Sequence, residues 1–327
     1  MNFRTSLPPL EADFTITHQD ALLSIGSCFT KHIGNRLIDL KFNNLLNPFG
    51  IIFNPISLSN ALHYLLSDRT FTEDDLFYHH EQWHSFMHHS CFSGMDKIAT
   101  LDHMNLSLHE ARTHFKQVNR LLITLGTANV FIYKKTGEIV ANNHKLPIQD
   151  FERRRLHIRD IAEAFEPLFR ELKRQTPGLH IIMTVSPVRH IRDGLIENQR
   201  SKAALLIALE HLVRDLDYVH YFPSYEYMMD DLRDYRFYES DMIHPNEQAI
   251  AYIWERFSDA FFDAKTRELN QRIDEIIRAS RHRPFHPRSQ QHRAFLRQQL
   301  EKIAALERAY PDLNFRRERQ AFERQMV

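Results

Sequence analysis

The sequence predicts an α/β protein with three layers, α/β/α, in which helices cover both faces of a mostly parallel sheet. Short apolar runs of strand length alternate with amphipathic helical stretches as far as residue 262. Strands separated by helices pair in parallel, because each crossover returns the chain to the same end of the sheet. From residue 263 charged residues alternate with aliphatic ones at helical spacing. We therefore expect a core domain over residues 1–262 and a charged helical C-terminal extension over 263–327.

The first predicted element is a buried strand at residues 22–25, which ends at Gly26, Ser27 and Cys28. Apolar residues at roughly helical spacing follow over residues 33–40. The turn therefore leads from the carboxyl end of a strand to a helix, where unpaired backbone N–H groups can receive negative charge. Because serine and cysteine can both act as nucleophiles, this turn is a candidate catalytic position.

A candidate base lies more than two hundred residues later, between Ser240 and Asn246. Asp241 and His244 are three residues apart, just ahead of a helix that is predicted to begin near Pro245. From one turn, the carboxylate can orient the imidazole, so we expect His244 to act as general base and Asp241 to hold its tautomer.

The remaining elements continue the alternation. Buried strands are predicted at 120–127, 180–188 and 218–223, and a hairpin at 130–133 and 138–141. Residues 42–55 have the composition of turns. Helices are predicted at 56–66, 106–118, 158–174, 198–211, 247–262, 265–280 and 294–309.

A histidine- and aromatic-rich insertion occupies residues 70–100. His80, His84 and His88 recur every four residues, so on a helix they would share one face and could bind a metal. No regular carboxylate or thiol completes that set, and the stretch could equally be extended. We therefore expect no metal here, and place these histidines in the wall of a polar cleft or at the surface.

Composition limits the partners and the compartment. Lys and Arg total 42 and Asp and Glu total 42, so no global field attracts nucleic acid or an acidic membrane. Only Cys28 and Cys91 are present, residues 1–5 lack an apolar targeting core, and no apolar stretch could span a bilayer. These features predict a cytoplasmic protein with reduced thiols and no membrane partner. The sequence indicates no cofactor.

The C-terminal extension is basic, with ten arginines and one lysine against five acidic residues over 281–327. It could bind a partner or nucleic acid, or its helices could pack on the core or on a second copy of the chain. We favour packing, because no aromatic stacking platform accompanies the charges.

Several short runs together resemble the GSCFA family over about residues 1–260. The run from Gly26 to Phe29 reads Gly-Ser-Cys-Phe, the residues after which the family is named, and Thr30 stands where the family usually has Ala. The other similar runs are Asn47–Gly50 with Asn54 and Pro55, 124–128, 186–190 with Ser186, Arg189 and His190, Ser201 with Lys202, and 241–245. The GSCFA family in turn resembles the SGNH/GDSL hydrolases, which implies an SGNH-like, flavodoxin-like fold.

The SGNH resemblance implies roles for further residues. Gly50 is the candidate second backbone donor to an oxyanion. Gly126, Thr127 and Asn129 lie where SGNH enzymes carry a donor asparagine, but that position itself holds Ala128. Either Asn129 or Thr127 then substitutes as the donor, or the donor is absent. Loss of one such donor typically slows a reaction by ~10²–10³.

Three more residues are expected at the cleft. Arg189 and His190 follow the strand that ends at Ser186, so both could reach the same edge of the sheet, and Arg189 could hold a substrate anion. The GSCFA resemblance also includes His89, which it places in a pocket wall.

The resemblance places Cys28 at the position of the SGNH serine, and Ser27 at that of a noncatalytic aspartate. A thiol at a helix N-terminus near a histidine is a good nucleophile, which also favours Cys28. The competing assignment has Ser27 attacking while Cys28 is buried as a small apolar residue.

The expected activity is acyl transfer through a covalent acyl-enzyme, as an esterase, thioesterase or O-acyltransferase that acts on an acylated small molecule or glycan. Two alternatives stay open. The chain could be a degenerate SGNH-fold binding module, as Ala128 suggests, or an interaction protein that works through its basic C-terminal helices.

Overall fold

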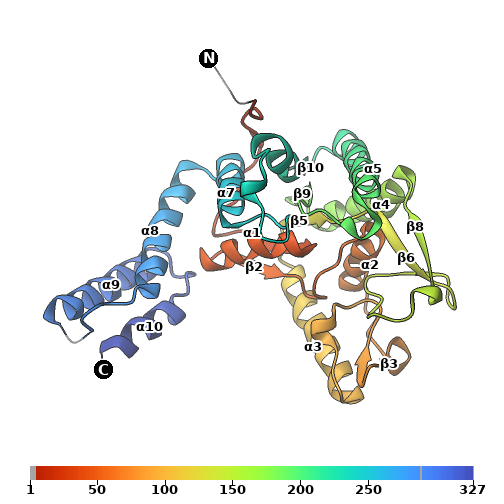
Figure 1. Cartoon of the computed structure of the whole chain (residues 1–327). Helices are drawn as coiled ribbons and strands as arrows, with labels where there is room; N and C mark the ends of the chain where they lie inside the picture. The colour runs from red at the N-terminus through yellow and green to blue at the C-terminus, as the bar shows by residue number, and fades with distance from the viewer. Residues whose placement is uncertain (1–4, 288, 327) are drawn as a thin grey trace.

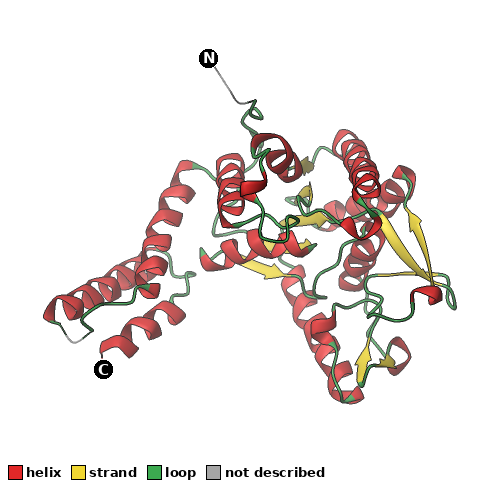
Figure 2. Cartoon of the chain, viewed as in Figure 1, coloured by secondary structure: helices red, strands yellow, loops and turns green. Residues whose placement is uncertain are grey.

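A computed structural model of the chain describes residues 5–287 and 289–326, and its centre is a sheet of five parallel strands (Figures 1 and 2). The strand order is β10-β9-β5-β1-β2. Residues 1–4, which hold most of the stretch expected to lack a targeting core, lie outside the described residues. The strands are β1 Ala21–Gly26, β2 Asn43–Leu46, β5 Arg120–Leu125, β9 His180–Val185 and β10 Val219–Tyr221.

The order of the strands fixes where a site can form. Along the sheet the five strands follow the doubly wound, flavodoxin-like order 2-1-3-4-5, so the chain changes direction between β1 and β5. These two strands pair in register, with Leu23 opposite Leu121 and Gly26 opposite Thr124. In open parallel sheets ligands bind at the carboxyl ends of strands beside such a switch point. The turn after Gly26 lies there.

Helices cover both faces of the sheet, which confirms the predicted three-layer α/β/α fold. Leu23, Ile123 and Met183 face a core shared with α2, α3, α4 and α5, whereas Leu22 and Ile182 face a second core shared with α1, α7 and α8. The helices are α1 Cys28–Asp39, α2 Pro55–Leu66, α3 Lys97–Phe115, α4 Ile158–Gln175, α5 Leu195–Asp215, α6 Ser224–Glu226, α7 Glu247–Phe261, α8 Ala264–Arg281, α9 Gln290–Ala309 and α10 Arg316–Met326.

Several elements differ from the sequence prediction. β2 lies in a stretch expected to form turns, because its pairing with β1 outweighs its polar composition. α3 begins at Lys97, nine residues before the predicted start at Leu106, since the Asp96 side chain caps it by accepting from the Ala99 N–H. α1 likewise begins at Cys28. A charged strand, β8 Phe151–Arg155, joins the predicted hairpin, β6 Asn129–Tyr133 and β7 Glu138–Val140, in a small antiparallel sheet.

The insertion at 70–100 is not a metal-binding helix. It contains a hairpin of two short strands, β3 Phe77–His79 and β4 Gln82–His84, with His80 in the turn. His84 contacts Ser93 Oγ and the His79 carbonyl oxygen, and His88 packs in the core against Phe49 and Phe71. These two histidines are therefore parts of the packing.

The C-terminal helices α8, α9 and α10 lie together at one side of the molecule, away from α2 to α5 (Figure 1). They join the core at α1 and the residues after it, through an ion pair of Lys41 Nζ with Glu318 Oε1 at 2.8 Å and another of Arg36 with Asp274. Lys41 and Glu318 are almost wholly buried. These ion pairs connect the C-terminal helices to the core. Among the described residues, no helix combines the length and apolarity that a membrane span requires.

Candidate active site

The turn after β1 needs a glycine. Gly26 has a φ of +145°, and a Cβ there would overlap the carbonyl oxygen of Thr124 on β5. Its N–H donates to Asn47 Oδ1 at 2.9 Å, and its carbonyl oxygen accepts from the Ile52 N–H at 3.0 Å. The close approach of β5 and the two bonds fix the backbone just before Ser27 and Cys28.

The two candidate nucleophiles have different surroundings. Ser27 is the N-cap of α1, is fully buried, and donates its N–H to the Thr124 carbonyl oxygen at 3.1 Å. Its hydroxyl is shielded from solvent and has no hydrogen-bond partner among the described residues. Cys28, the first residue of α1, is half-buried and has a free thiol. A substrate can therefore reach Cys28 more readily than Ser27.

Opposing effects act on the Cys28 thiol. Burial is the largest and raises its pKa above the ordinary value, while the backbone N–H groups of Phe29 and Cys28 and the charges of Lys202 and Lys31 lower it. Because burial dominates, the resting thiol holds its proton at neutral pH. Attack on a carbonyl then requires a base that removes this proton.

Lys202 is a functional candidate that was noted in the sequence only as part of a family-like run. Its side chain is fully buried, and Nζ donates to the carbonyl oxygens of Gly126 at 2.8 Å and Ser186 at 2.6 Å. It thus joins the carboxyl ends of β5 and β9. No carboxylate pairs with it within the described part of the chain, and burial lowers its pKa to about 7. An uncompensated buried lysine favours a nearby negative charge, such as a thiolate or an oxyanion.

Asp241 and His244 form the pair that the sequence predicts. Asp241 Oδ2 lies 2.7 Å from His244 Nδ1, and Oδ1 accepts from the backbone N–H groups of Ile243 and His244. These bonds lower the pKa of Asp241 to about 2. The carboxylate therefore stays ionised and fixes the imidazole, which leaves His244 Nε2 to exchange a proton.

The charge of His244 reaches groups near the Cys28 turn. It contributes, after burial, to the lowered pKa of His32 on α1 and of His190 after β9. Lys31, next to His32, acts electrostatically on Cys28, His89 and Cys91. His244 therefore acts electrostatically on His32 and His190, whereas it is not among the charges that shift the pKa of Cys28.

Gly50 does not offer the backbone donor expected of it. Its N–H donates to the Asn47 carbonyl oxygen at 2.8 Å, closing a turn. Its φ is +77°, and a Cβ would overlap His89, which explains the glycine. The role expected for Gly50 therefore does not fit this conformation. His89 packs beside Gly50 and is half-buried, and its Nδ1 accepts from the Cys91 N–H.

The polar groups after β5 also have internal partners. The Thr127 hydroxyl lies 3.0 Å from Ser201 Oγ and accepts from the Asn129 N–H, and Asn129 Nδ2 donates to Asp193. Ala128 is fully buried and donates its N–H to Ser201 Oγ at 2.7 Å. The Thr127 hydroxyl and one N–H of the Asn129 amide therefore already have partners within the protein.

Two further predicted residues have structural contacts. Asn54 caps α2 by accepting from the Ser57 N–H, and its Nδ2 donates to Ser57 Oγ and to the Val140 carbonyl oxygen. Ser186 is fully buried, and its Oγ accepts from the Val188 N–H. Both residues therefore support the edge of the sheet, and both are too buried to contact a substrate directly.

His190 and Arg189 lie where β9 ends. His190 packs on Phe53, and its Nε2 lies 3.2 Å from the position of a Cβ on Gly126 and has no hydrogen-bond partner within residues 5–287 and 289–326. Burial, with the charges of Lys202 and His244, lowers its pKa to about 3. His190 is therefore neutral. Arg189 contacts Met229 Sδ at 3.6 Å and acts electrostatically on Tyr225 and Tyr238, so it lies near these two aromatic side chains.

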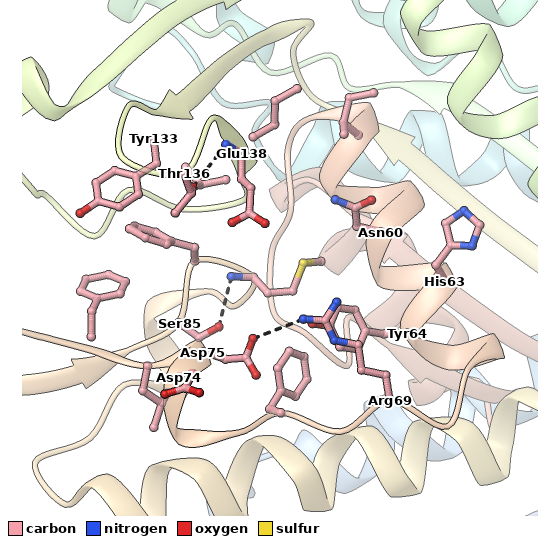
Figure 3. Close-up of a pocket in the computed structure, with 18 of the residues that line it drawn as sticks. Asn60, His63, Tyr64, Arg69, Asp74, Asp75, Ser85, Tyr133, Thr136 and Glu138 are labelled. Atoms are coloured by element: carbon pink, nitrogen blue, oxygen red, sulfur yellow. Dashed lines mark hydrogen bonds and ion pairs between the residues drawn. The ribbon is translucent and has the colours of Figure 1, made fainter.

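A separate groove of about 870 Å³ lies between α2, the insertion and the β6–β7 hairpin (Figure 3). Tyr64, Arg69, Asp75 and Glu138 are among the polar side chains that line it. None of the predicted site residues belongs to its lining.

Comparison with family models gives two matches. The model described as the GSCFA family matches residues 21–257, and the model described as GSCFA domain protein, C-terminal domain, matches residues 273–327. A comparison with curated proteins gives no match. The first range contains every predicted site residue, and the second covers the C-terminal half of α8 and all of α9 and α10.

Proposed function

The chain belongs to the GSCFA family, and from this premise we propose that it is an SGNH-like acyl-transferring enzyme with Cys28 as nucleophile. One observation carries the proposal: the Asp241 carboxylate holds His244 Nδ1 at 2.7 Å, as a general base in a catalytic triad requires. The exposure of Cys28 at the helix N-terminus, against the complete burial of Ser27, supports the choice of nucleophile.

In the proposed reaction, His244 Nε2 removes the Cys28 proton as the sulfur attacks the carbonyl carbon of an ester or thioester. The oxyanion that forms accepts from the backbone N–H groups of the first turn of α1, and the buried charge of Lys202 favours it. Collapse breaks the bond to the alcohol or thiol, which leaves with the proton from His244. The acyl group then remains on Cys28.

Deacylation returns the site to its starting state. His244 removes a proton from water or from a sugar hydroxyl, the oxygen attacks the thioester carbon, and the Cys28 sulfur leaves and is reprotonated. Water as acceptor gives an esterase or thioesterase, and a sugar gives an O-acyltransferase. We propose an acylated small molecule or glycan as substrate. The two free cysteines support action in the cytoplasm, where thiols stay reduced.

We also propose a division of the chain at residues 262 and 263 into the acyl-transferring core and a helical extension. Separate family models for residues 21–257 and 273–327 support this division. The buried ion pair of Lys41 with Glu318 supports a fixed attachment of the extension to the core.

The test is release of nitrophenolate from p-nitrophenyl acetate, and of free thiol from an acetyl thioester. We expect the wild type to turn over both, Cys28→Ala to lose at least 10²-fold, and Ser27→Ala to stay within a few-fold. Cys91→Ala is the matched control, because Cys91 is the other free thiol and is exposed. Turnover that persists in Cys28→Ala would contradict the proposal.

The second candidate is a binding module without turnover. Two points favour it: Ala128 stands where the SGNH resemblance implies a donor asparagine, and the Gly50 N–H is bonded to the Asn47 carbonyl oxygen. Such a module would bind an acylated ligand but release no product from either substrate. Saturable binding by a wild type that shows no burst of product would select this alternative.

A further inference from the structure

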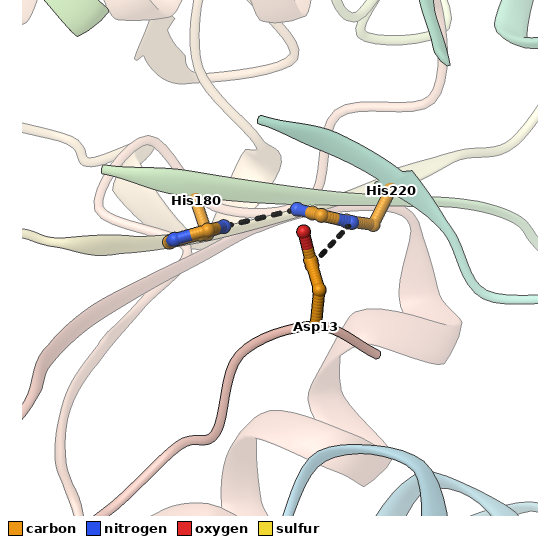
Figure 4. A group of neighbouring side chains, drawn as sticks. All are labelled: Asp13, His180 and His220. Carbon is orange, nitrogen blue, oxygen red and sulfur yellow. Dashed lines mark hydrogen bonds and ion pairs between the residues drawn. The ribbon is translucent and has the colours of Figure 1, made fainter. Parts of the chain in front are cut away.

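Three side chains that could bind a metal meet at the amino-terminal edge of the sheet, at the opposite ends of the strands from Cys28 (Figure 4). His180 is the first residue of β9, His220 is the middle residue of the neighbouring β10, and Asp13 lies in the segment before β1. His180 Nδ1 is 3.0 Å from His220 Nε2, and His220 Nδ1 is 3.7 Å from Asp13 Oδ1.

We propose that Asp13, His180 and His220 bind a divalent transition-metal ion of the Zn²⁺ type. One ligand atom from each residue lies within 4.8 Å of the other two. In a tetrahedral zinc site with bonds of about 2.0–2.1 Å, ligand atoms lie roughly 3.3 Å apart. If His220 binds through Nε2, which faces His180, these two nitrogens need to separate slightly. The Asp13 oxygen, which lies beside Nδ1 of His220, then needs to move toward Nε2.

The chemistry of the three ligands selects the class of ion. Two imidazoles with one carboxylate suit zinc, copper, nickel or iron, whereas magnesium and calcium prefer sites made of oxygen ligands. Three protein ligands leave a fourth position for water. The proposal is independent of the acyl chemistry at the other edge of the sheet.

A transition-metal ion binds the neutral form of imidazole through a ring nitrogen. The ion would replace the proton that the two rings share in their N···N contact. The positive charges of Arg120 and Lys173 disfavour a cation at this site, whereas the negative charges of Asp13 and Asp217 favour it. Arg120 already pairs with Asp20 at 3.1 Å.

The framework holds two ligands firmly and leaves the third adjustable. Phe14 stacks on His180 with ring centroids 4.1 Å apart and contacts His220 at 4.6 Å. The Ile16 N–H donates to the Phe261 carbonyl oxygen at 2.8 Å, which anchors the segment to the end of α7. The Asp13 side chain is 73% exposed and can rotate toward the rings. A bound ion would fasten this segment to β9 and β10.

The experiment uses the full chain, freed of metal with a chelator and titrated with Co²⁺ and then with Zn²⁺. We expect one Co²⁺ per chain, with visible absorption typical of nitrogen and oxygen ligands, displacement by Zn²⁺, and a higher Tm with Zn²⁺. The variant His180→Gln/His220→Gln is expected to weaken binding at least 10-fold, and Asp13→Asn to weaken it several-fold.

The matched control is His79→Gln/His80→Gln, because these rings also lie close together, with centroids 3.9 Å apart. It should bind Co²⁺ like the wild type. Absence of saturable binding to the wild type, or equal affinity in His180→Gln/His220→Gln, would overturn the proposal. If that double variant does not fold, the Co²⁺ affinity of Asp13→Asn becomes the test, and wild-type affinity in this variant would overturn the proposal. Asp13 is exposed, so its replacement should not disturb the core.

Discussion

Asp241 holds His244 with both of its oxygens: Oδ2 lies 2.7 Å from the ring nitrogen Nδ1, and Oδ1 lies 3.0 Å from the backbone nitrogen of the same residue. One carboxylate thus fixes both the position and the tautomer of the imidazole. The proposed mechanism depends on this pair, because the raised pKa of the Cys28 thiol makes a base necessary.

Replacement of the carboxylate tests its orienting role. Asp241→Asn should lower the rate of acylation by roughly 10²–10⁴, because an amide nitrogen facing Nδ1 stabilises the wrong tautomer of His244. The measurement is the burst of nitrophenolate in stopped flow. Asp230→Asn is the control, since Asp230 is an exposed aspartate that pairs with Arg233. Equal rates in both variants would show that Asp241 is not needed.

The buried charge of Lys202 should lower the pKa of the Cys28 thiol. Lys202→Met removes a positive charge that lowers the pKa of Cys28, so this pKa should rise and alkylation by iodoacetamide at pH 7 should slow several-fold. Mass spectrometry of the Cys28 peptide across pH measures both quantities. Lys173→Met, which removes a half-buried lysine bonded to the Leu179 carbonyl oxygen, should leave them unchanged. An unshifted pH profile in Lys202→Met would refute the electrostatic role.

Acid should destabilise the fold through its buried histidines. Burial lowers the pKa of His88 from 6.5 to about 3, so between these values the unfolded chain binds a proton that the folded chain does not. The free energy of unfolding therefore falls as pH decreases through this window, by at most about 1.4 kcal/mol per pH unit for one such group.

The variant His88→Leu isolates this contribution. Urea unfolding at pH 6.5 and 4.5 should show a smaller loss of stability in His88→Leu than in the wild type, although His144, with a pKa lowered to about 4, keeps part of the effect. His109→Leu, at an exposed position, should behave like the wild type. The same loss in all three proteins would contradict the assignment.

Replacement of two glycines by alanine should have opposite effects on stability. Gly26→Ala should destabilise the fold by roughly 3 kcal/mol or more, because the new methyl group meets the β5 backbone at Thr124 and φ is +145°. Gly178→Ala should be neutral or stabilising by up to about 1 kcal/mol, since nothing lies within 4 Å of its Cβ position. Thermal unfolding compares them, and similar effects would argue against the strained turn.

Much of the fold was predictable because its strands are continuous apolar runs. β1, β5 and β9 are buried on both faces over most of their length, as parallel strands usually are, and the sequence therefore predicts them. β10 at the edge is partly buried and was also predicted, since it too is an apolar and aromatic run. β2 and β8 were not predicted, because strand pairing stabilises their polar residues.

The site was predictable only where its groups are close in sequence. Asp241 and His244 share one turn, so their spacing indicates the pair. The buried position of Lys202 depends on hydrogen bonds to carbonyl groups 76 and 16 residues away, and no local sequence pattern indicates these contacts. The contact of Asp13 with His220 likewise depends on the order of the strands.

The most direct test of the central proposal is the mass of the intact protein, taken within seconds of mixing with p-nitrophenyl acetate. We predict one added acetyl group, located on Cys28 by peptide mapping, and its absence in His244→Gln. Acetylation confined to Cys91 or lysines, or equally fast labelling of Cys28 in His244→Gln, would contradict a cysteine nucleophile served by this histidine.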